Sequence, residues 1–232
     1  RERLRARLAQ ERGYYRYPAG ARTRFALVYP NTYFVGMSNL GLHIVYALLN
    51  ERSDTACERV FLPDRDEMPR YVRTNTPMMS VETQTPLADF AIVGFAISFE
   101  MDYFHVAEML ARSHITPLAA DRTAHDPLVI AGGPCATFNP EPLAALIDAF
   151  VIGEGEAILP AMMDAYHAGL HAGDDRAALL QRLSHIPGVY VPALYTPAYD
   201  AAGHLTALLP QAGAPSHVAR QWVEDLDAHP AH

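Results

Sequence analysis

Short apolar segments alternate with helical patterns through the first three quarters of the chain, and this alternation constrains its fold more than any other feature. Five such segments occur: RFALVYP at 24–30, CERVFLP at 57–63, DFAIVGFAIS at 89–98, PLVIAGGP at 127–134 and DAFVIGEGE at 148–156. Most are apolar at successive positions, which is typical of strands buried on both faces of a parallel sheet. We therefore expect a doubly wound, flavodoxin-like (Rossmann-like) α/β domain with a mainly parallel five-stranded sheet.

The composition divides the chain into three parts. Eight arginines and two glutamates fall within residues 1–24, whereas the whole chain has a formal net charge of −8 and no lysine. We expect a basic arm at 1–23, the α/β domain at 24–172, and a helix, short β-hairpin and linker at 173–232. The arm is compatible with a solvated helix, with docking on the body or a further domain, and with a nucleic-acid contact. The acidic body argues against nucleic acid as a partner.

Several classes of protein do not suit this sequence. No apolar run approaches the roughly 18 residues that cross a bilayer, and no basic-then-apolar leader opens the chain, so we expect no membrane partner and a cytoplasmic location. Cys57 and Cys135 form no CxxC or Cys/His cluster. Neither a disulfide framework nor a four-ligand metal site is therefore expected.

The loops that follow the strands are the expected site. In open α/β sheets, ligands bind outside the carboxyl ends of the strands. Here these ends carry PNTYFVG at 30–36, SFEMDY at 98–103, GGPCATFNPE at 132–141 and GEGE at 153–156. Glu100, Asp102 and Glu141 lie in these loops, but their spacing pairs none of them for acid–base work. His105 is interpreted as a partly buried histidine of an amphipathic helix.

Two of these strand ends carry a pair of glycines. Gly132 and Gly133 let a backbone approach a large flat ligand, or they form a tight strand-to-helix turn. The GEGE run places Glu154 and Glu156 at a helix N-terminus, where they repel phosphate, so we reject a nucleotide there. A flavin remains an alternative, although no Ser/Thr-rich phosphate loop follows the first strand.

The segment LVIAGGPCATFNPEPLAALIDAFVIGEGEAILP, at 128–160, resembles cobalamin (B12)-binding-type domains that precede a radical SAM domain. In that family a GG-P segment, a Pro-Glu and an Asp-x-x-Val-x-Gly-Glu-Gly-Glu run occur in this order. The segments FALVYPNTYFVGMSNLGLHIVYALLNER and CERVFLP are also similar to the amino-terminal part of such proteins, in an uncharacterised subfamily. The resemblance covers about residues 24–170.

The resemblance implies a domain that holds cobalamin, a small-molecule cofactor, against a C-terminal radical SAM domain of the same polypeptide. That domain would carry the CxxxCxxC motif for a 4Fe-4S cluster and would bind S-adenosylmethionine. Because this chain has only two cysteines, we expect it to be inactive alone.

The cobalamin motif DxHxxG, aligned by its glycine, falls on Asn31, Tyr33 and Gly36. A neutral phenol is a poor cobalt ligand, so the resemblance implies cobalamin held without a histidine ligand. The implied cofactor-binding residues are Asn31, Thr32, Tyr33, Gly36, Ser98, Gly132, Gly133, Pro134, Gly153, Glu154 and Gly155. The competing hypothesis is a degenerate domain without cofactor, which shapes substrate access or mediates contacts between domains or with a partner.

Overall fold

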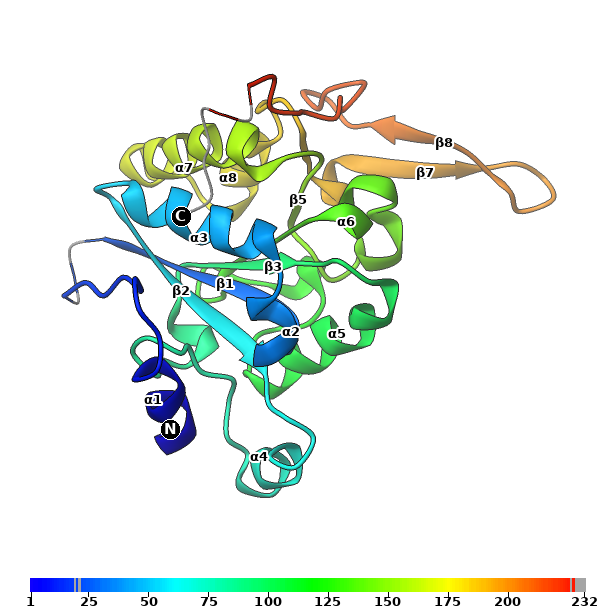
Figure 1. Cartoon of the computed structure of the whole chain (residues 1–232). Helices are drawn as coiled ribbons and strands as arrows, with labels where there is room; N and C mark the ends of the chain where they lie inside the picture. The colour runs from blue at the N-terminus through cyan, green and yellow to red at the C-terminus, as the bar shows by residue number, and fades with distance from the viewer. Residues whose placement is uncertain (19, 21, 226, 228–232) are drawn as a thin grey trace.

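A computed structural model describes residues 1–18, 20, 22–225 and 227. One sheet of six strands lies at its centre, in the order β2-β1-β3-β4-β5-β6 (Figure 1). The first five strands are parallel, and β6 is antiparallel to β5. Their bounds are β1 Thr23–Thr32, β2 Thr55–Leu62, β3 Ile92–Ala96, β4 Leu128–Gly132, β5 Ala149–Val151 and β6 Val189–Tyr190. This doubly wound order confirms the expected Rossmann-like α/β fold with a mainly parallel sheet.

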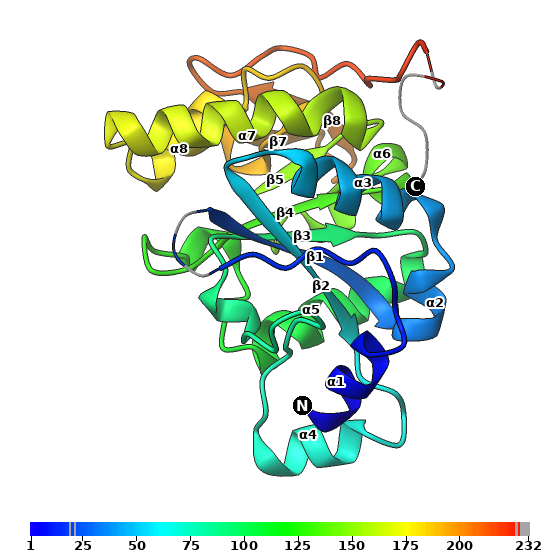
Figure 2. The ribbon, with the colours of Figure 1, turned by 60° about the vertical axis from the view of Figure 1, so that its left-hand side comes forward.

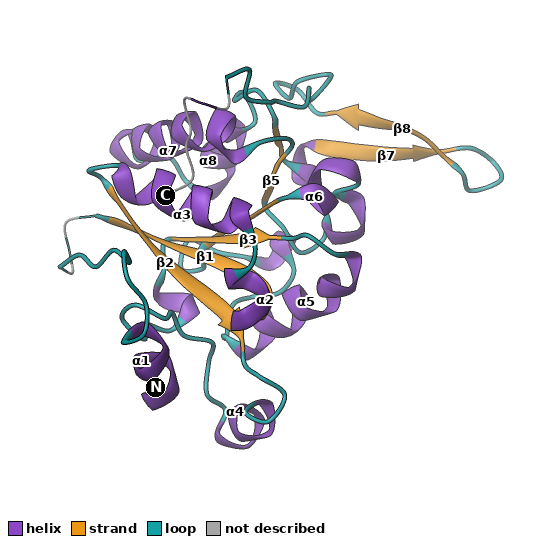
Figure 3. Ribbon diagram, viewed as in Figure 1, coloured by secondary structure: helices purple, strands orange, loops and turns teal. Residues whose placement is uncertain are grey.

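Helices cover both faces of the sheet (Figure 3). Their bounds are α1 Glu2–Leu8, α2 Tyr33–Met37, α3 Leu40–Glu51, α4 Met68–Thr74, α5 Tyr103–Arg112, α6 Pro134–Phe138, α7 Gly155–Ala172 and α8 Arg176–Leu183. Short 3-10 turns span Leu87–Asp89, Glu100–Asp102, Ala119–Asp121, Glu141–Leu143 and Pro192–Leu194. Alternate strand residues point to opposite faces, so the sheet divides the core in two. Helices α3, α7 and α8 pack on the face that carries Leu27 and Ile130, and α5 and α6 pack on the face that carries Val28 and Ala131.

The sheet has one strand more than the expected five. Val189 and Tyr190, from the segment after the main domain, pair with β5 and are buried. They cover the edge of β5, whose backbone groups would otherwise remain unpaired. The expected hairpin follows as a separate ribbon of β7 (Tyr195–Tyr199) and β8 (Leu205–Pro210), which extends away from the body (Figure 1).

The basic arm docks on the body beside β2 and α4 (Figure 2). Arg3 pairs with Asp66 at 3.0 Å, and Arg7 pairs with Asp64. Farther along, the Glu11 carboxylate accepts a hydrogen bond of 2.6 Å from Arg59 on β2. The arm therefore packs against acidic residues of its own chain, which agrees with the alternative in which it docks on the body.

Asp126 holds the loop between α5 and β4. Its carboxylate accepts hydrogen bonds from the backbone N–H groups of Thr116 at 3.1 Å and Thr123 at 2.9 Å. Partial burial acts to raise the pKa of this carboxyl, but the hydrogen bonds from Thr123 and Thr116 prevail and lower it to about 2. Because the folded-state pKa lies below the ordinary value, the ionised group stabilises the fold above about pH 4, and this contribution is lost as the pH falls toward 2.

We expect Asp126→Asn to be less stable than the wild type at pH 7 and to lose less stability between pH 4 and pH 2. Chemical denaturation at several pH values measures both effects. Asp121→Asn, a change at an exposed acid on the same loop, serves as the control. Equal pH dependence of the wild type and Asp126→Asn would contradict the assignment.

Candidate functional site

A cavity of about 370 Å³ opens at the carboxyl ends of the parallel strands. It lies between the sheet, α3 and α7, and its walls include Leu27, Val45, Ile130 and Leu159. Its volume falls within the roughly 300–1,000 Å³ of small-molecule sites. Seven of the residues predicted from the sequence line it: Ser98, Gly132, Gly133, Pro134, Gly153, Glu154 and Gly155.

Gly132, the last residue of β4, and Gly133 differ in whether the backbone requires glycine at their positions. Gly133 has a φ of +97°, and a Cβ there would lie 2.7 Å from the Ile97 carbonyl oxygen. The tight turn therefore requires glycine at this position whatever the cavity holds. Gly132 has no such strain, and its added Cβ would lie 3.4 Å from Cβ of Val151. The bare backbone at Gly132 thus leaves space in the cavity that the turn itself does not require.

The GEGE run joins the cavity to the last described segment of the chain. Gly153 forms a parallel bridge with Gln221, and the Glu154 carboxylate accepts a hydrogen bond from the Val223 N–H. Helix α7 begins at Gly155 without a side-chain cap, and Glu156 lines the cavity beside it. The segment around residues 221–223 therefore runs beside the carboxyl edge of the sheet.

Residues 30–36, the loop that the sequence placed after the first strand, do not line this cavity, although Asn39 and Gly41 farther along do. Tyr33 starts α2 and turns toward β2, where its ring packs on Phe61 with centroids 5.2 Å apart. Its hydroxyl donates a hydrogen bond of 2.6 Å to Glu11. Burial, together with this bond, raises the pKa of Tyr33 to about 12. A Cβ on Gly36 would overlap the Phe61 ring, so this glycine serves the packing of α2 on β2.

A polar cluster lies at the carboxyl ends of β1 and β3, where the strand order reverses. The Asn31 amide donates to Asp102 at 2.9 Å, and Thr32 donates its backbone N–H to the Asn31 side chain at 2.8 Å. His105 Nδ1 lies 2.8 Å from the Pro30 carbonyl oxygen and 3.3 Å from Asp102 Oδ1. The pairing of Asp102 with His105 was not expected. Their i,i+3 spacing across a helix start is the only sequence signal for it.

Several large exposed apolar side chains belong to the loops and helices that follow β1, β3 and β4, and Trp222 lies next to Gln221, which is bridged to Gly153. We call this set the apolar rim: Phe34, Leu40, Phe99, Met101, Phe104, Phe138 and Trp222. Phe34 and Phe138 are 81% and 83% exposed. Contiguous exposed apolar residues mark binding surfaces.

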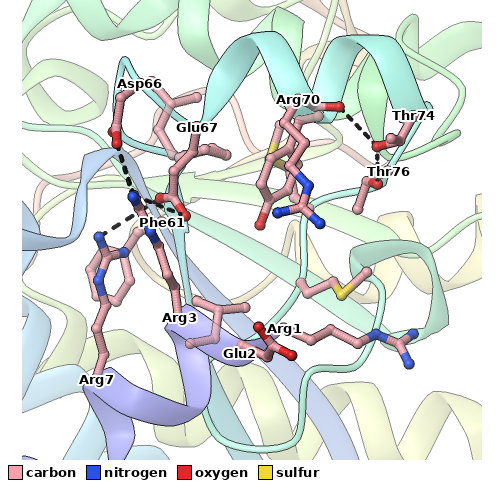
Figure 4. A pocket seen from close by; sticks show the side chains of 16 residues that line it. Arg1, Glu2, Arg3, Arg7, Phe61, Asp66, Glu67, Arg70, Thr74 and Thr76 are labelled. Atoms are coloured by element: carbon pink, nitrogen blue, oxygen red, sulfur yellow. Dashed lines mark hydrogen bonds and ion pairs between the residues drawn. The ribbon is translucent and has the colours of Figure 1, made fainter.

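A larger cavity of about 660 Å³ lies between α1 and α4. Figure 4 shows Arg3 and Arg7 directed toward Asp66 and Glu67 across it. Because carboxylates of the loop before α4 pair with Arg3 and Arg7, the cavity belongs to the docking of the arm.

The described residues contain no group of three or more His, Cys, Asp or Glu placed to hold a metal ion. Cys57 and Cys135 are free and buried, and burial raises the pKa of the Cys57 thiol well above its usual range. Among the helices of the described chain, none is long and apolar enough to cross a membrane.

Comparison with known proteins places the chain in a family. Residues 41–192 match the family described as "Radical SAM proteins, N-terminal", which is more than half of the chain. Over 133 residues the chain is 23% identical to an uncharacterized protein of Methanocaldococcus jannaschii, covering 56% of this chain and 24% of that protein. The chain thus spans about a quarter of the length of this relative. No solved structure matches. This chain belongs to the family of N-terminal domains of radical SAM proteins.

Proposed function

We propose that this chain is an accessory domain that holds cobalamin between its carboxyl edge and the radical SAM domain of the same polypeptide. The observation that carries the proposal is the cavity at the strand ends, which is lined by Ser98, by Gly132 and by Gly155 at the start of α7. The 2-1-3-4-5 order of the parallel strands supports a flavodoxin-like assignment for the domain.

The cavity suits one part of cobalamin in particular. Apolar walls and the bare backbone of Gly132 fit the flat benzimidazole base of the nucleotide tail. The tail phosphate fits less well at the start of α7, because Glu156 stands there beside the helix N-terminus. The base therefore enters the cavity, and the phosphate stays away from α7.

The corrin ring would lie on the apolar rim, outside the sheet. Exposed phenylalanine side chains such as Phe34 and Phe138 offer the flat apolar contacts that a macrocycle needs. Tyr33 does not take part as a ligand, because its hydroxyl is bound to Glu11 and its ring is packed on Phe61.

The radical chemistry would belong to the partner domain. The radical SAM family implies S-adenosylmethionine and a 4Fe-4S cluster in the catalytic domain. The two cysteines of this chain are too few for the CxxxCxxC motif that would hold the cluster. The segment around Gln221 pairs with Gly153 at the carboxyl edge, next to the rim. The rim and the extended β7–β8 hairpin are therefore the surfaces that would face the radical SAM domain. Two-stranded hairpins are marginally stable alone, which favours such support.

A second candidate follows from the apolar rim. In this alternative, the rim packs directly on the radical SAM domain, and the N-terminal domain shapes substrate access without a cofactor. The rim supports it because such a surface suits a domain interface as well as it suits a ligand.

Retention of a corrinoid separates the two candidates. The full-length polypeptide that contains this chain is mixed with hydroxocobalamin, desalted, and examined by visible absorption. We expect corrinoid absorbance to remain with the protein in a near-stoichiometric amount. A colourless protein would refute the cobalamin proposal and favour direct packing of the rim.

A further inference from the structure

The docking of the arm leaves open space in the larger cavity, between α1 and α4. Both terminal nitrogens of Arg3 donate to the Asp66 carboxylate at 3.0 Å, and Arg7 pairs with Asp64. The cavity beside these pairs has a volume of about 660 Å³. This volume falls within the roughly 300–1,000 Å³ of small-molecule sites. The arm therefore forms one wall of the cavity and does not fill it.

Part of the cavity wall is apolar. The apolar residues come from α1, from β2 and from the segment after α4: Leu4, Phe61, Leu62, Met78 and Met79. All of these except Leu4 are buried, so the packing of the core holds them in place. Methionine side chains are polarisable and adapt to the shape of a bound group. This wall therefore offers a fixed apolar surface on which a ligand can rest.

Two hydrogen-bond donors of α4 line the cavity, and neither has a side-chain hydrogen bond within the described residues: the Arg70 guanidinium and the Tyr71 hydroxyl. Figure 4 shows the Arg70 guanidinium directed from α4 into the space that faces α1. The Thr74 hydroxyl donates to the Arg70 carbonyl oxygen at 2.8 Å and lies 2.6 Å from the Thr76 hydroxyl. Because Thr76 must then donate to Thr74, these hydroxyls have no proton left for an anion. Arg70 and Tyr71 are the donors of α4 that an anion can use.

The charges around the cavity limit which anion it can take. Four arginines and three carboxylates line it: Arg1, Arg3, Arg7 and Arg70 with Glu2, Asp66 and Glu67. The excess of one positive charge suits a ligand with one negative charge. A phosphate monoester carries about 1.5 to 2 negative charges at pH 7, so the three carboxylates would repel it more strongly. A carboxylate carries one charge and matches the planar fork of a guanidinium.

We propose that the cavity between α1 and α4 binds an organic monocarboxylate that has an apolar body. Arg70 pairs with the carboxylate, Tyr71 donates a hydrogen bond to it, and the apolar body rests on Phe61 and Met78. This site is independent of the cobalamin proposal, because the two cavities share no lining residue. Since α1 forms one wall, a bound ligand also stabilises the docked position of the arm.

Three probes with the same apolar body test the proposal: naphthylacetate, naphthylacetamide and naphthyl phosphate. The full-length polypeptide that contains this chain is dialysed to equilibrium against each probe, and bound probe is measured by its fluorescence. We expect saturable binding of naphthylacetate. The uncharged amide should bind about tenfold more weakly, because it loses the charge pairing with Arg70. Naphthyl phosphate should also bind more weakly than naphthylacetate, because the carboxylates of the cavity repel it.

Variants of α4 locate the site. Arg70→Gln should bind naphthylacetate about tenfold more weakly than the wild type, and Tyr71→Phe a few-fold more weakly. Arg73→Gln is the matched control, since Arg73 is exposed on the same helix and does not line the cavity, and this variant should keep the wild-type affinity.

The wild-type protein can refute the proposal by itself. Absence of saturable binding, or equal affinities for naphthylacetate and its amide, would overturn it. An affinity for naphthyl phosphate that equals or exceeds that for naphthylacetate would overturn the ligand class. Equal affinities of Arg70→Gln and Arg73→Gln for naphthylacetate would show that the probe binds elsewhere, which would overturn the assignment of the site.

Discussion

Replacement of Arg59 by methionine is expected to lower the free energy of unfolding by about 3–5 kcal/mol, because it leaves a buried carboxylate without its partner. The Arg59 side chain is 3% exposed, and its Nε donates a hydrogen bond of 2.7 Å to Glu82, which is fully buried. A second guanidinium nitrogen donates to Glu11 of the arm at 2.6 Å. The guanidinium also lies 4.5 Å from the centre of the Tyr46 ring.

The hydrogen bonds of Arg59 connect three elements of the fold. Glu11 links Arg59 to Tyr33, so the arm, the edge strand β2 and the start of α2 share one network. Urea denaturation followed by circular dichroism measures the change in unfolding free energy. Arg3→Met is the matched control, because Arg3 pairs with Asp66 at the surface and should cost at most about 1 kcal/mol.

A double variant separates lost charge pairing from lost packing. In Arg59→Met with Glu82→Gln, position 82 no longer holds a buried carboxylate without its partner, and the glutamine oxygen can still accept from the backbone N–H of residue 59 that Glu82 now binds at 2.8 Å. We expect the double variant to be more stable than Arg59→Met. Equal costs for Arg59→Met and Arg3→Met would show that the pair is not a buried one.

The parts of the fold that were predicted from the sequence depend on local and repeated patterns. Strands buried on both faces appear as apolar runs, so four of the five parallel strands are clear from composition alone. Strand β2 is less clear, because it carries Glu58 and Arg59 in its middle. The convergence of Ser98, Gly132 and Glu154 follows from topology, since the carboxyl ends of parallel strands meet at one edge.

The parts that were not predicted depend on contacts between distant residues. The direction of Tyr33 is set by Phe61 and by Glu11 of the arm, which no local pattern reveals. The position of the His105 ring likewise depends on the Pro30 carbonyl oxygen, 75 residues away in the chain. The sixth strand consists of only Val189 and Tyr190, and its pairing with β5 is a tertiary contact that propensity does not encode.

Filling the cavity from Gly132 is expected to weaken corrinoid binding by about a hundredfold, which corresponds to about 2.8 kcal/mol. Gly132 ends β4 on the same face as Ile130, so the side chain in Gly132→Leu would enter the space between α3 and α7. The backbone there carries no strain that requires glycine. An apolar side chain in an apolar cavity should leave the thermal midpoint unchanged or raise it.

Gly132→Ala is the matched control, because its added methyl group would make an ordinary contact 3.4 Å from Cβ of Val151 and leave most of the cavity open. We expect this variant to bind the corrinoid within a few-fold of the wild type. Titration of each variant with hydroxocobalamin, followed by visible absorption and thermal denaturation, measures both effects. Because leucine would block the cavity without disturbing the turn at Gly133, wild-type affinity in Gly132→Leu would show that the nucleotide tail lies elsewhere.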